Sequence, residues 1–140
     1  MATLEDAILL AVQAHRGQRD KAGAPYILHP LRLMLRMTSE AEMMAAVLHD
    51  VIEDTHHTLD DLRRAGYPEE VLEALNCLTH RTGESYDAFI ARIKPNPLAR
   101  KVKIADLEDN MDIRRISDLR PKDVQRLKRY QQAWAELTRG

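Results

Sequence analysis

The chain has 140 residues, which fits one domain and leaves little room for a second. Its 21 Lys and Arg residues nearly balance its 22 Asp and Glu residues, so the net charge of −1 gives no electrostatic footprint for DNA or an anionic membrane. We therefore expect neither nucleic acid nor membrane as a partner. Cys77 is the only cysteine, which excludes an intramolecular disulfide and a Cys-rich zinc site and fits a cytoplasmic location.

Helical signals begin at the start of the chain. From Thr3 to about Arg16, apolar residues return at the spacing of one helix face. The polar stretch from Gly17 to Pro25 contains two glycines and a proline, and it predicts a loop. Pro30 can open the next helix, because a proline is tolerated at the first helical position.

The same signals continue to the end of the chain. Helix starts with a capping-box spacing occur at Thr3 with Asp6, Ser39 with Glu42 and Thr58 with Asp61. No segment alternates apolar and polar residues as a strand would. The sequence therefore predicts an all-α, compact multi-helix bundle that forms one domain over residues 1–140. In chain order, the expected helices cover residues 3–16, 31–37, 39–50, 58–65, 68–78, 86–93, 97–113 and 122–137.

Three blocks place polar side chains inside helical apolar patterns, where a polar group is costly to bury unless something pairs with it. The blocks span residues 26–30, 49–55 and 103–110. In the second block, a continued helical turn would stack Glu53 beside His49 and Asp54 beside Asp50. In the third, Lys103, Asp106 and Asn110 lie along one helix face.

The acids of these blocks would repel each other if they gathered at one point, unless a cation held some of them. A divalent metal resolves this repulsion. Imidazole nitrogen and carboxylate oxygen together suit manganese, iron or zinc, and sequence spacing does not choose among these ions.

The blocks also carry a family resemblance. The adjacent pair His49-Asp50, with a histidine on an earlier helix and Asp106 far downstream, resembles the HD-domain metal-dependent phosphohydrolases. More narrowly, about Leu4 to Arg115 resembles the hydrolase domain of RelA/SpoT-type proteins, and the stand-alone small alarmone hydrolases fit closely because no synthetase domain follows. The segments that carry this resemblance read HRGQ at 15–18, GAPYILHP at 23–30, LHDVIEDT at 48–55 and KIADLEDN at 103–110.

The resemblance implies an activity and a set of site residues. It implies a Mn²⁺-dependent phosphohydrolase that removes the 3′-pyrophosphate from (p)ppGpp-like or (p)ppApp-like alarmone nucleotides. It implies that Glu53 and Asp54 position or deprotonate the attacking water and that Asn110 contacts the substrate nucleoside. We predict Lys21, Tyr26 and Lys103 as further substrate contacts. The metal ligands that the resemblance implies are His29, His49, Asp50 and Asp106.

One loop departs from the family pattern. The alarmone hydrolases commonly carry an Arg-x-Ser-Gly stretch that packs against the guanine, whereas this chain has Asp20-Lys21-Ala22-Gly23. Stacking by that arginine is therefore not carried over, and the base preference stays open. Two alternatives follow, namely an HD-domain phosphohydrolase acting on a different nucleotide or phosphate ester, and a non-catalytic nucleotide-binding module.

Several of these residues also have a structural interpretation. Glu53 and Asp54 could cap the helix that follows them, and Tyr26 could bury its ring in the core. Lysines on a helix of mixed charge are usually solvated, so a substrate role for Lys103 and a solvated position are about equally expected. We expect His56 and His57 to be exposed and to bind no metal.

Overall fold

The computed structural model describes residues 1–139, and within them the fold is all-α, with no named β-strand. The prediction of an all-helical bundle is confirmed. In chain order the elements are α1 (Leu4–Ala14), α2 (Leu28–Leu35), α3 (Glu40–Leu48), α4 (Val51–Asp54), α5 (Leu59–Ala65), α6 (Glu69–Leu78), α7 (Tyr86–Ile93), α8 (Pro97–Asn110), a 3₁₀ turn (Ile113–Arg115) and α9 (Pro121–Thr138).

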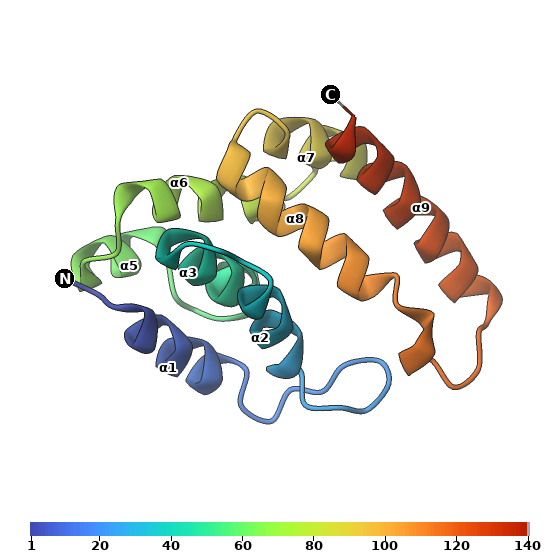
Figure 1. The fold of residues 1–140 in the computed structure, drawn as a ribbon, viewed down its shortest axis with the longest axis horizontal. Helices are drawn as coiled ribbons and strands as arrows, with labels where there is room; N and C mark the ends of the chain where they lie inside the picture. Colours follow the sequence, from blue (N-terminus) through green and yellow to red (C-terminus); the bar gives the residue numbers. More distant parts are fainter. Residues whose placement is uncertain (140) are drawn as a thin grey trace.

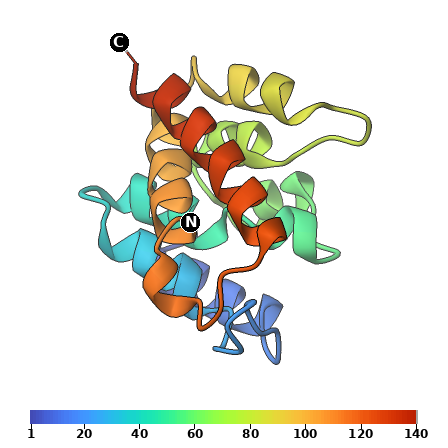
Figure 2. The same ribbon diagram turned by 90° about the vertical axis from the view of Figure 1, so that its right-hand side faces the viewer.

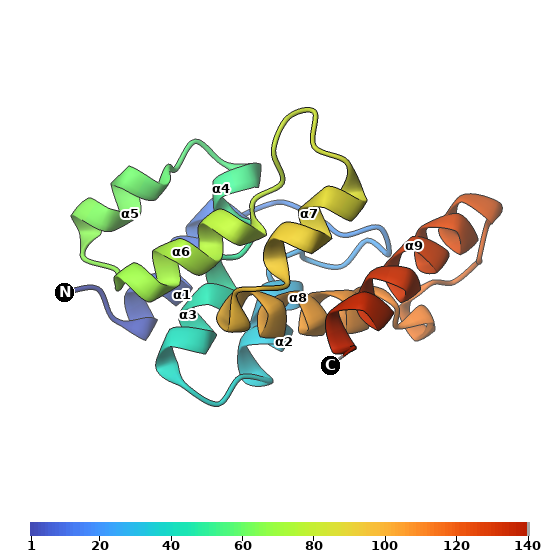
Figure 3. The same cartoon turned by 90° about the horizontal axis from the view of Figure 1, so that it is seen from above.

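Helix α3 is the central element of the bundle. It packs against α1, α2, α6 and α8, and its last five residues, 44–48, are all buried. A helix that is apolar on every side belongs in the interior, which explains this position. Figure 1 shows α8 crossing the molecule between the α2 and α3 layer and α9, and Figure 2 shows α9 lying along α8. Figure 3 places α5 and α9 at opposite ends of the molecule.

The predicted helix starts are confirmed. Thr3, Ser39 and Thr58 each accept a hydrogen bond from a backbone N–H three residues later, and the acid at that later position bonds back to the cap. Gly66 ends α5 with φ of +93°. An added Cβ there would lie 3.1 Å from the Cα atom of Met1, so both the backbone conformation and the chain terminus favour glycine.

Several predicted helix boundaries are wrong, including the ends of α1 and α2, which lie at Ala14 and Leu35 rather than at Arg16 and Met37. Helix α2 begins at Leu28 rather than at Pro30, because a proline in the first turn forfeits only an N–H that has no helical partner anyway. Helix α3 ends at Leu48, and the backbone turns at His49 and Asp50 before the separate helix α4 begins. Helix α8 ends at Asn110 and gives way to the 3₁₀ turn.

Among the residues that the structure describes, no helix is both long enough and apolar enough to cross a bilayer.

Candidate metal centre and active site

The three central helices bring four predicted metal ligands together, and we call this group the His-Asp cluster. Helix α2 supplies His29, the end of α3 supplies His49 and Asp50, and α8 supplies Asp106. The ligand atoms of His29, His49 and Asp50 all lie within 4.8 Å of one another. Asp106 Oδ1 lies 2.8 Å from His29 Nε2 and 3.5 Å from His49 Nε2, so it faces the same point.

Both histidines turn Nε2 toward this point because their Nδ1 atoms are already engaged. His49 Nδ1 donates to the carbonyl of Ala46 at 2.7 Å. His29 Nδ1 donates to Asp109 Oδ2 at 2.5 Å, and Arg32 holds that carboxylate through two hydrogen bonds of 2.8 and 2.9 Å. Such outer partners fix the tautomer and ring orientation of a metal-binding histidine.

The Nε2 atom of His49 is the most informative atom of the cluster. It is buried and lies 3.0 Å from Asp50 Oδ2, yet the geometry gives it no hydrogen bond. An imidazole nitrogen that faces carboxylate oxygens needs a positive charge between them, either a proton on Nε2 or a metal ion. Two imidazole nitrogens and two carboxylates form a donor set that suits a divalent ion, so these residues fit the predicted metal.

Opposite charges in the cluster shift the pKa values of its members. Burial lowers the pKa of His49, but the negative charges of Asp50 and Asp106 outweigh burial and raise the pKa well above its usual value. Burial raises the pKa of Asp50, and the charge of His49 outweighs it, which lowers the pKa to about 2. A divalent cation would replace the imidazolium protons as the compensating positive charge.

Lys103 and Asn110, predicted as substrate contacts, both bond to Asp106. Lys103 Nζ lies 2.9 Å from Asp106 Oδ2, and its side chain is 13% exposed. Burial lowers the pKa of Lys103, but the adjacent carboxylate outweighs burial and raises the pKa above its usual value. Asn110 Nδ2 donates to Asp106 Oδ1 at 3.2 Å. In this arrangement both side chains orient Asp106.

The two predicted contacts from the α1–α2 loop lie in different surroundings. The hydroxyl of Tyr26 donates to Asp50 Oδ2, and the ring is half-buried with its centroid 5.6 Å from that of His29. Lys21 is exposed. Partial burial and then the positive charge of Arg126 on α9 lower the pKa of Lys21, so this part of the loop lies near α9.

Glu53 and Asp54 lie on α4, where the N–H of Asp54 donates to the carbonyl of Asp50 at 2.9 Å, as in a helical turn. The carboxylate of Glu53 accepts a hydrogen bond from the backbone N–H of His80. Burial and then the charge of Asp50 raise the pKa of both acids.

No role was predicted from the sequence for Asp109 or Arg32. Asp109 lies three residues after Asp106 within the KIADLEDN block, so an acid on the same helix face was a signal for it. Arg32 carried no comparable signal, because its contact with Asp109 joins segments that are far apart in the chain.

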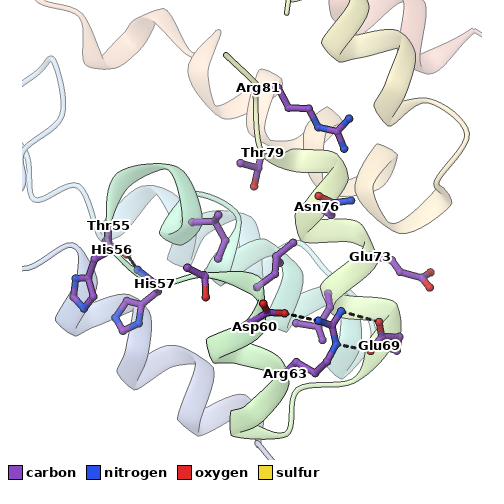
Figure 4. A pocket seen from close by; sticks show the side chains of 14 residues that line it. Thr55, His56, His57, Asp60, Arg63, Glu69, Glu73, Asn76, Thr79 and Arg81 are labelled. Atoms are coloured by element: carbon purple, nitrogen blue, oxygen red, sulfur yellow. Dashed lines mark hydrogen bonds and ion pairs between the residues drawn. The ribbon is translucent and has the colours of Figure 1, made fainter. Parts of the chain in front are cut away.

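A hollow on the surface lies elsewhere, between the α4–α5 connection and α6, and we call it the α5–α6 groove (Figure 4). Its volume is about 630 Å³. His56 and His57 stack on each other there, with ring centroids 4.5 Å apart, and Arg63 pairs with Asp60 and Glu69. His56 is exposed as predicted, whereas His57 is half-buried. Among the described residues, the metal-ligand geometry occurs in the His-Asp cluster and not here.

Comparison with known proteins reveals relatives of one kind. The chain is 32% identical over 140 residues to the bifunctional (p)ppGpp synthase/hydrolase SpoT of Escherichia coli, covering 90% of this chain and 20% of that protein. It is 34% identical over 134 residues to the guanosine-3′,5′-bis(diphosphate) 3′-pyrophosphohydrolase of Haemophilus influenzae, covering 85% of this chain and 19% of that protein. A GTP pyrophosphokinase of Streptomyces coelicolor is 33% identical over 121 residues, which are 77% of this chain and 14% of that protein. The chain thus spans about a fifth or less of the length of these relatives.

The fold gives the same indication. A solved structure of a metazoan SpoT ortholog, described as hydrolysing ppGpp, matches with a TM-score of 0.78 and 22% identity, covering all of this chain and 87% of that one. No family model matches the chain. The helical architecture is therefore shared with this ortholog, and the sequence relatives are proteins of the SpoT kind. The chain is an HD-domain protein of the RelA/SpoT type.

Proposed function

We propose that the chain is a divalent-metal-dependent phosphohydrolase that removes the 3′-pyrophosphate from a guanosine or adenosine alarmone, with Mn²⁺ as its metal. The observation that carries the proposal is the buried Nε2 atom of His49, which has no hydrogen-bond partner and faces the carboxylates of Asp50 and Asp106. The relatives in Escherichia coli and Haemophilus influenzae are named for hydrolysis of guanosine alarmones, which supports the substrate class.

His29, His49, Asp50 and Asp106 are the residues that would hold the ion. When bound there, Mn²⁺ would supply Lewis acidity toward a phosphate oxygen and a lower pKa for the attacking water. Asp109 and the Ala46 carbonyl support this role, because they keep both Nε2 lone pairs directed into the cluster.

Glu53 and Asp54 would accept the proton of the attacking water. Burial and the charge of Asp50 raise the pKa of both carboxyls, which makes each a better proton acceptor than an ordinary acid. The water oxygen forms a bond to the first phosphorus of the 3′-diphosphate. The bond from that phosphorus to the 3′-oxygen breaks, and the 3′-oxygen leaves with a proton as the nucleoside hydroxyl.

The remaining predicted residues would bind and orient. Lys21 offers a cation for the phosphates of the nucleotide, and Asn110 offers an amide for the nucleoside. Tyr26 restrains Asp50 through its hydroxyl, and Lys103 neutralises Asp106. If Lys103 also contacted a substrate phosphate, its ammonium group would have to bind that phosphate and the Asp106 carboxylate at the same time.

The loop before α2 favours a second candidate, a phosphohydrolase with the same centre and a different nucleotide or phosphate ester. Asp20, which stands at the guanine-stacking position of the family, accepts hydrogen bonds from the backbone N–H groups of Ala22 and Ala24 at 2.9 Å each. The neighbouring Arg19 donates to the carbonyl of Gly23 at 2.9 Å. Both side chains are engaged within their own loop, so this loop contributes little to base selection.

A nucleotide panel tests both candidates. We expect Mn²⁺-dependent release of pyrophosphate from guanosine and adenosine 3′,5′-bis(diphosphates), with kcat/KM values that are comparable for the two bases. Turnover of a different phosphate ester, with neither alarmone cleaved, would select the second candidate and overturn the first. A preference for guanosine above about a hundredfold would contradict the loose base selection, because one missing cation–π contact accounts for less than that.

A further inference from the structure

Arg92 of α7 is the centre of a hydrogen-bond network on the connection between α6 and α7, outside the His-Asp cluster. Its side chain is 20% exposed. The guanidinium group donates to the carbonyls of Asn76 at 3.1 Å and Cys77 at 3.3 Å, and to that of Thr79 at 2.9 Å. The first two bonds satisfy carbonyls that the end of α6 leaves without a helical partner. The bond to Thr79 lies beyond the helix and calls for a separate explanation.

The carbonyl of Thr79 and the N–H of His80 belong to the same peptide group. Arg92 Nη2 donates to this carbonyl, and the N–H donates to Oε1 of Glu53. The two groups of a planar trans peptide point in opposite directions, so a bond that fixes the carbonyl also fixes the direction of the N–H. A cation on the carbonyl oxygen further strengthens the N–H as a donor, because hydrogen bonds in a chain polarise one another.

Glu84 holds the rest of this connection in place. Its carboxylate pairs with Arg92 through two hydrogen bonds of 2.8 and 2.9 Å, and it accepts from the N–H of Arg81 at 3.2 Å. The carbonyl of Glu84 accepts from His80 Nε2 at 2.7 Å. The His80 ring lies against Phe89 of α7, with centroids 4.8 Å apart. The peptide group that faces Glu53 is therefore held by α7 and not by α4, on which Glu53 lies.

We propose that Arg92 is a positioning residue for Glu53, and that it acts through the peptide group between Thr79 and His80. The inference rests on the proposed function, in which Glu53 accepts a proton from the attacking water. A hydrogen bond on Oε1 restrains the rotation of the carboxylate and leaves Oε2 available to that water. Arg92 needs no contact with the metal or the substrate in this role.

The first test removes the N–H of His80. His80→Pro deletes this donor, and Thr79 already has the extended backbone, with φ of −93° and ψ of 116°, that a following proline favours. His80→Ala is the matched reference, because it removes the imidazole and keeps the N–H. We expect kcat of His80→Pro to lie about ten- to hundredfold below that of His80→Ala, with equal KM and equal metal content.

The second test is a double-mutant cycle between Arg92 and Glu53. Arg92→Lys keeps the positive charge and loses the planar fork, so it should lower kcat about tenfold with KM unchanged. In a Glu53→Gln background, the same substitution should have no further effect on kcat. The matched control is Arg100→Lys, since Arg100 holds backbone carbonyls at the end of α9 in a similar way. It should leave kcat unchanged.

A third measurement does not depend on activity. In ¹⁵N–¹H NMR spectra of the wild type, the backbone amide proton of His80 should lie downfield, because it donates to a carboxylate. Glu53→Gln and Arg92→Lys should each move this signal upfield, whereas Arg100→Lys should not. This measurement decides the question even if His80→Pro fails to fold.

The outcomes separate this inference from the proposed function. If the wild type hydrolyses its substrate and the two His80 variants have equal kcat, the positioning role is wrong and the function stands. An equal loss of kcat from Arg92→Lys in both backgrounds, or a His80 amide signal that ignores Arg92→Lys, would also overturn the positioning role. If the metal-loaded wild type hydrolyses nothing, the proposed function fails first, and the inference that rests on it fails with it.

Discussion

Two places in this molecule gather histidines and carboxylates, and they differ in how those groups are held. In the His-Asp cluster, His29 and His49 are buried, their Nδ1 atoms are engaged, and their Nε2 atoms converge with carboxylate oxygens. In the α5–α6 groove, the histidine rings stack on each other, and the exposed acids pair with an exposed arginine.

The difference shows which observations identify a site. The groove has a volume of about 630 Å³ and as many histidines as the cluster, and its arginine pairs with neighbouring acids. The cluster leaves a buried ligand atom unpaired beside negative charge, which is costly unless a ligand occupies the site. The metal centre is identified by ligand atoms that lie close together and include a buried nitrogen without a hydrogen-bond partner. Cavity size and residue composition do not identify it. Four predictions test this contrast.

The largest expected effect separates the two kinds of histidine. His49→Ala should abolish both bound Mn²⁺ and hydrolysis, because it removes a ligand that no neighbour can replace. Its matched control in the groove, His57→Ala, should keep full metal content and activity. Elemental analysis measures metal content, initial rates measure activity, and circular dichroism checks that both variants keep the helical fold. Equal metal loss in both variants would remove the distinction between the cluster and the groove.

The next effect separates metal binding from proton transfer. Glu53→Gln should keep Mn²⁺ and lower kcat about 10²- to 10⁴-fold, the usual contribution of a general base. The control is Glu73→Gln, an acid that lines the groove and should not affect turnover. If Glu53→Gln lost the ion, Glu53 would be a ligand rather than a base.

Ion pairs of the two regions should contribute different amounts to the free energy of unfolding of the protein. Lys103→Met leaves the buried carboxylate of Asp106 without its cation and should lower the free energy of unfolding by about 3–5 kcal/mol. Arg63→Met breaks a pair with Glu69 whose side chains are 51% and 61% exposed, and it should cost below about 1 kcal/mol. Urea denaturation of chelator-treated protein measures both values. Equal losses would show that burial does not distinguish the pairs.

The smallest effect concerns the helix that carries His49. Glu42 closes the capping box of α3 and pairs with Lys101 of α8, and hydrogen bonds from the Thr38 N–H and then Lys101 lower its pKa from 4.5 to about 2. Since the folded pKa is depressed, its stabilisation is present above about pH 4.5 and is lost as the pH falls toward 2.

Glu42→Gln should therefore cost about 1 kcal/mol at pH 7 and nothing near pH 2. Asp61→Asn, at the same position of the α5 capping box, should cost less, because Asp61 pairs only with Arg64 of its own helix. Urea unfolding of both variants across this pH range measures the two differences. A Glu42 effect that did not change with pH would contradict the assigned charge.

The sequence was most informative where local chemistry decides the structure. The capping boxes at Thr3, Ser39 and Thr58, and the glycine stop at Gly66, were all predictable because cap and partner lie within a few residues. The motif blocks also named His29, His49 and Asp50, which the fold brings together.

The rest depended on contacts between distant segments. Glu53 accepts a hydrogen bond from the N–H of His80, 27 residues later, and no local pattern indicates that partner. The pairing of His29 with Asp109 spans 80 residues. Lys103 was predicted to lie on the same helix face as Asp106, but its burial, with a side chain only 13% exposed, follows from the packing of α8 against other segments.

The central claim is that the His-Asp cluster holds a divalent metal on which phosphohydrolysis depends. The most direct test removes all metal with a chelator, adds Mn²⁺ in steps and measures pyrophosphate release from guanosine 3′,5′-bis(diphosphate) at each step. We predict no release from the metal-depleted protein, and release that rises to a plateau near one ion per chain. Undiminished hydrolysis after metal removal, or none at full metal loading, would contradict the account.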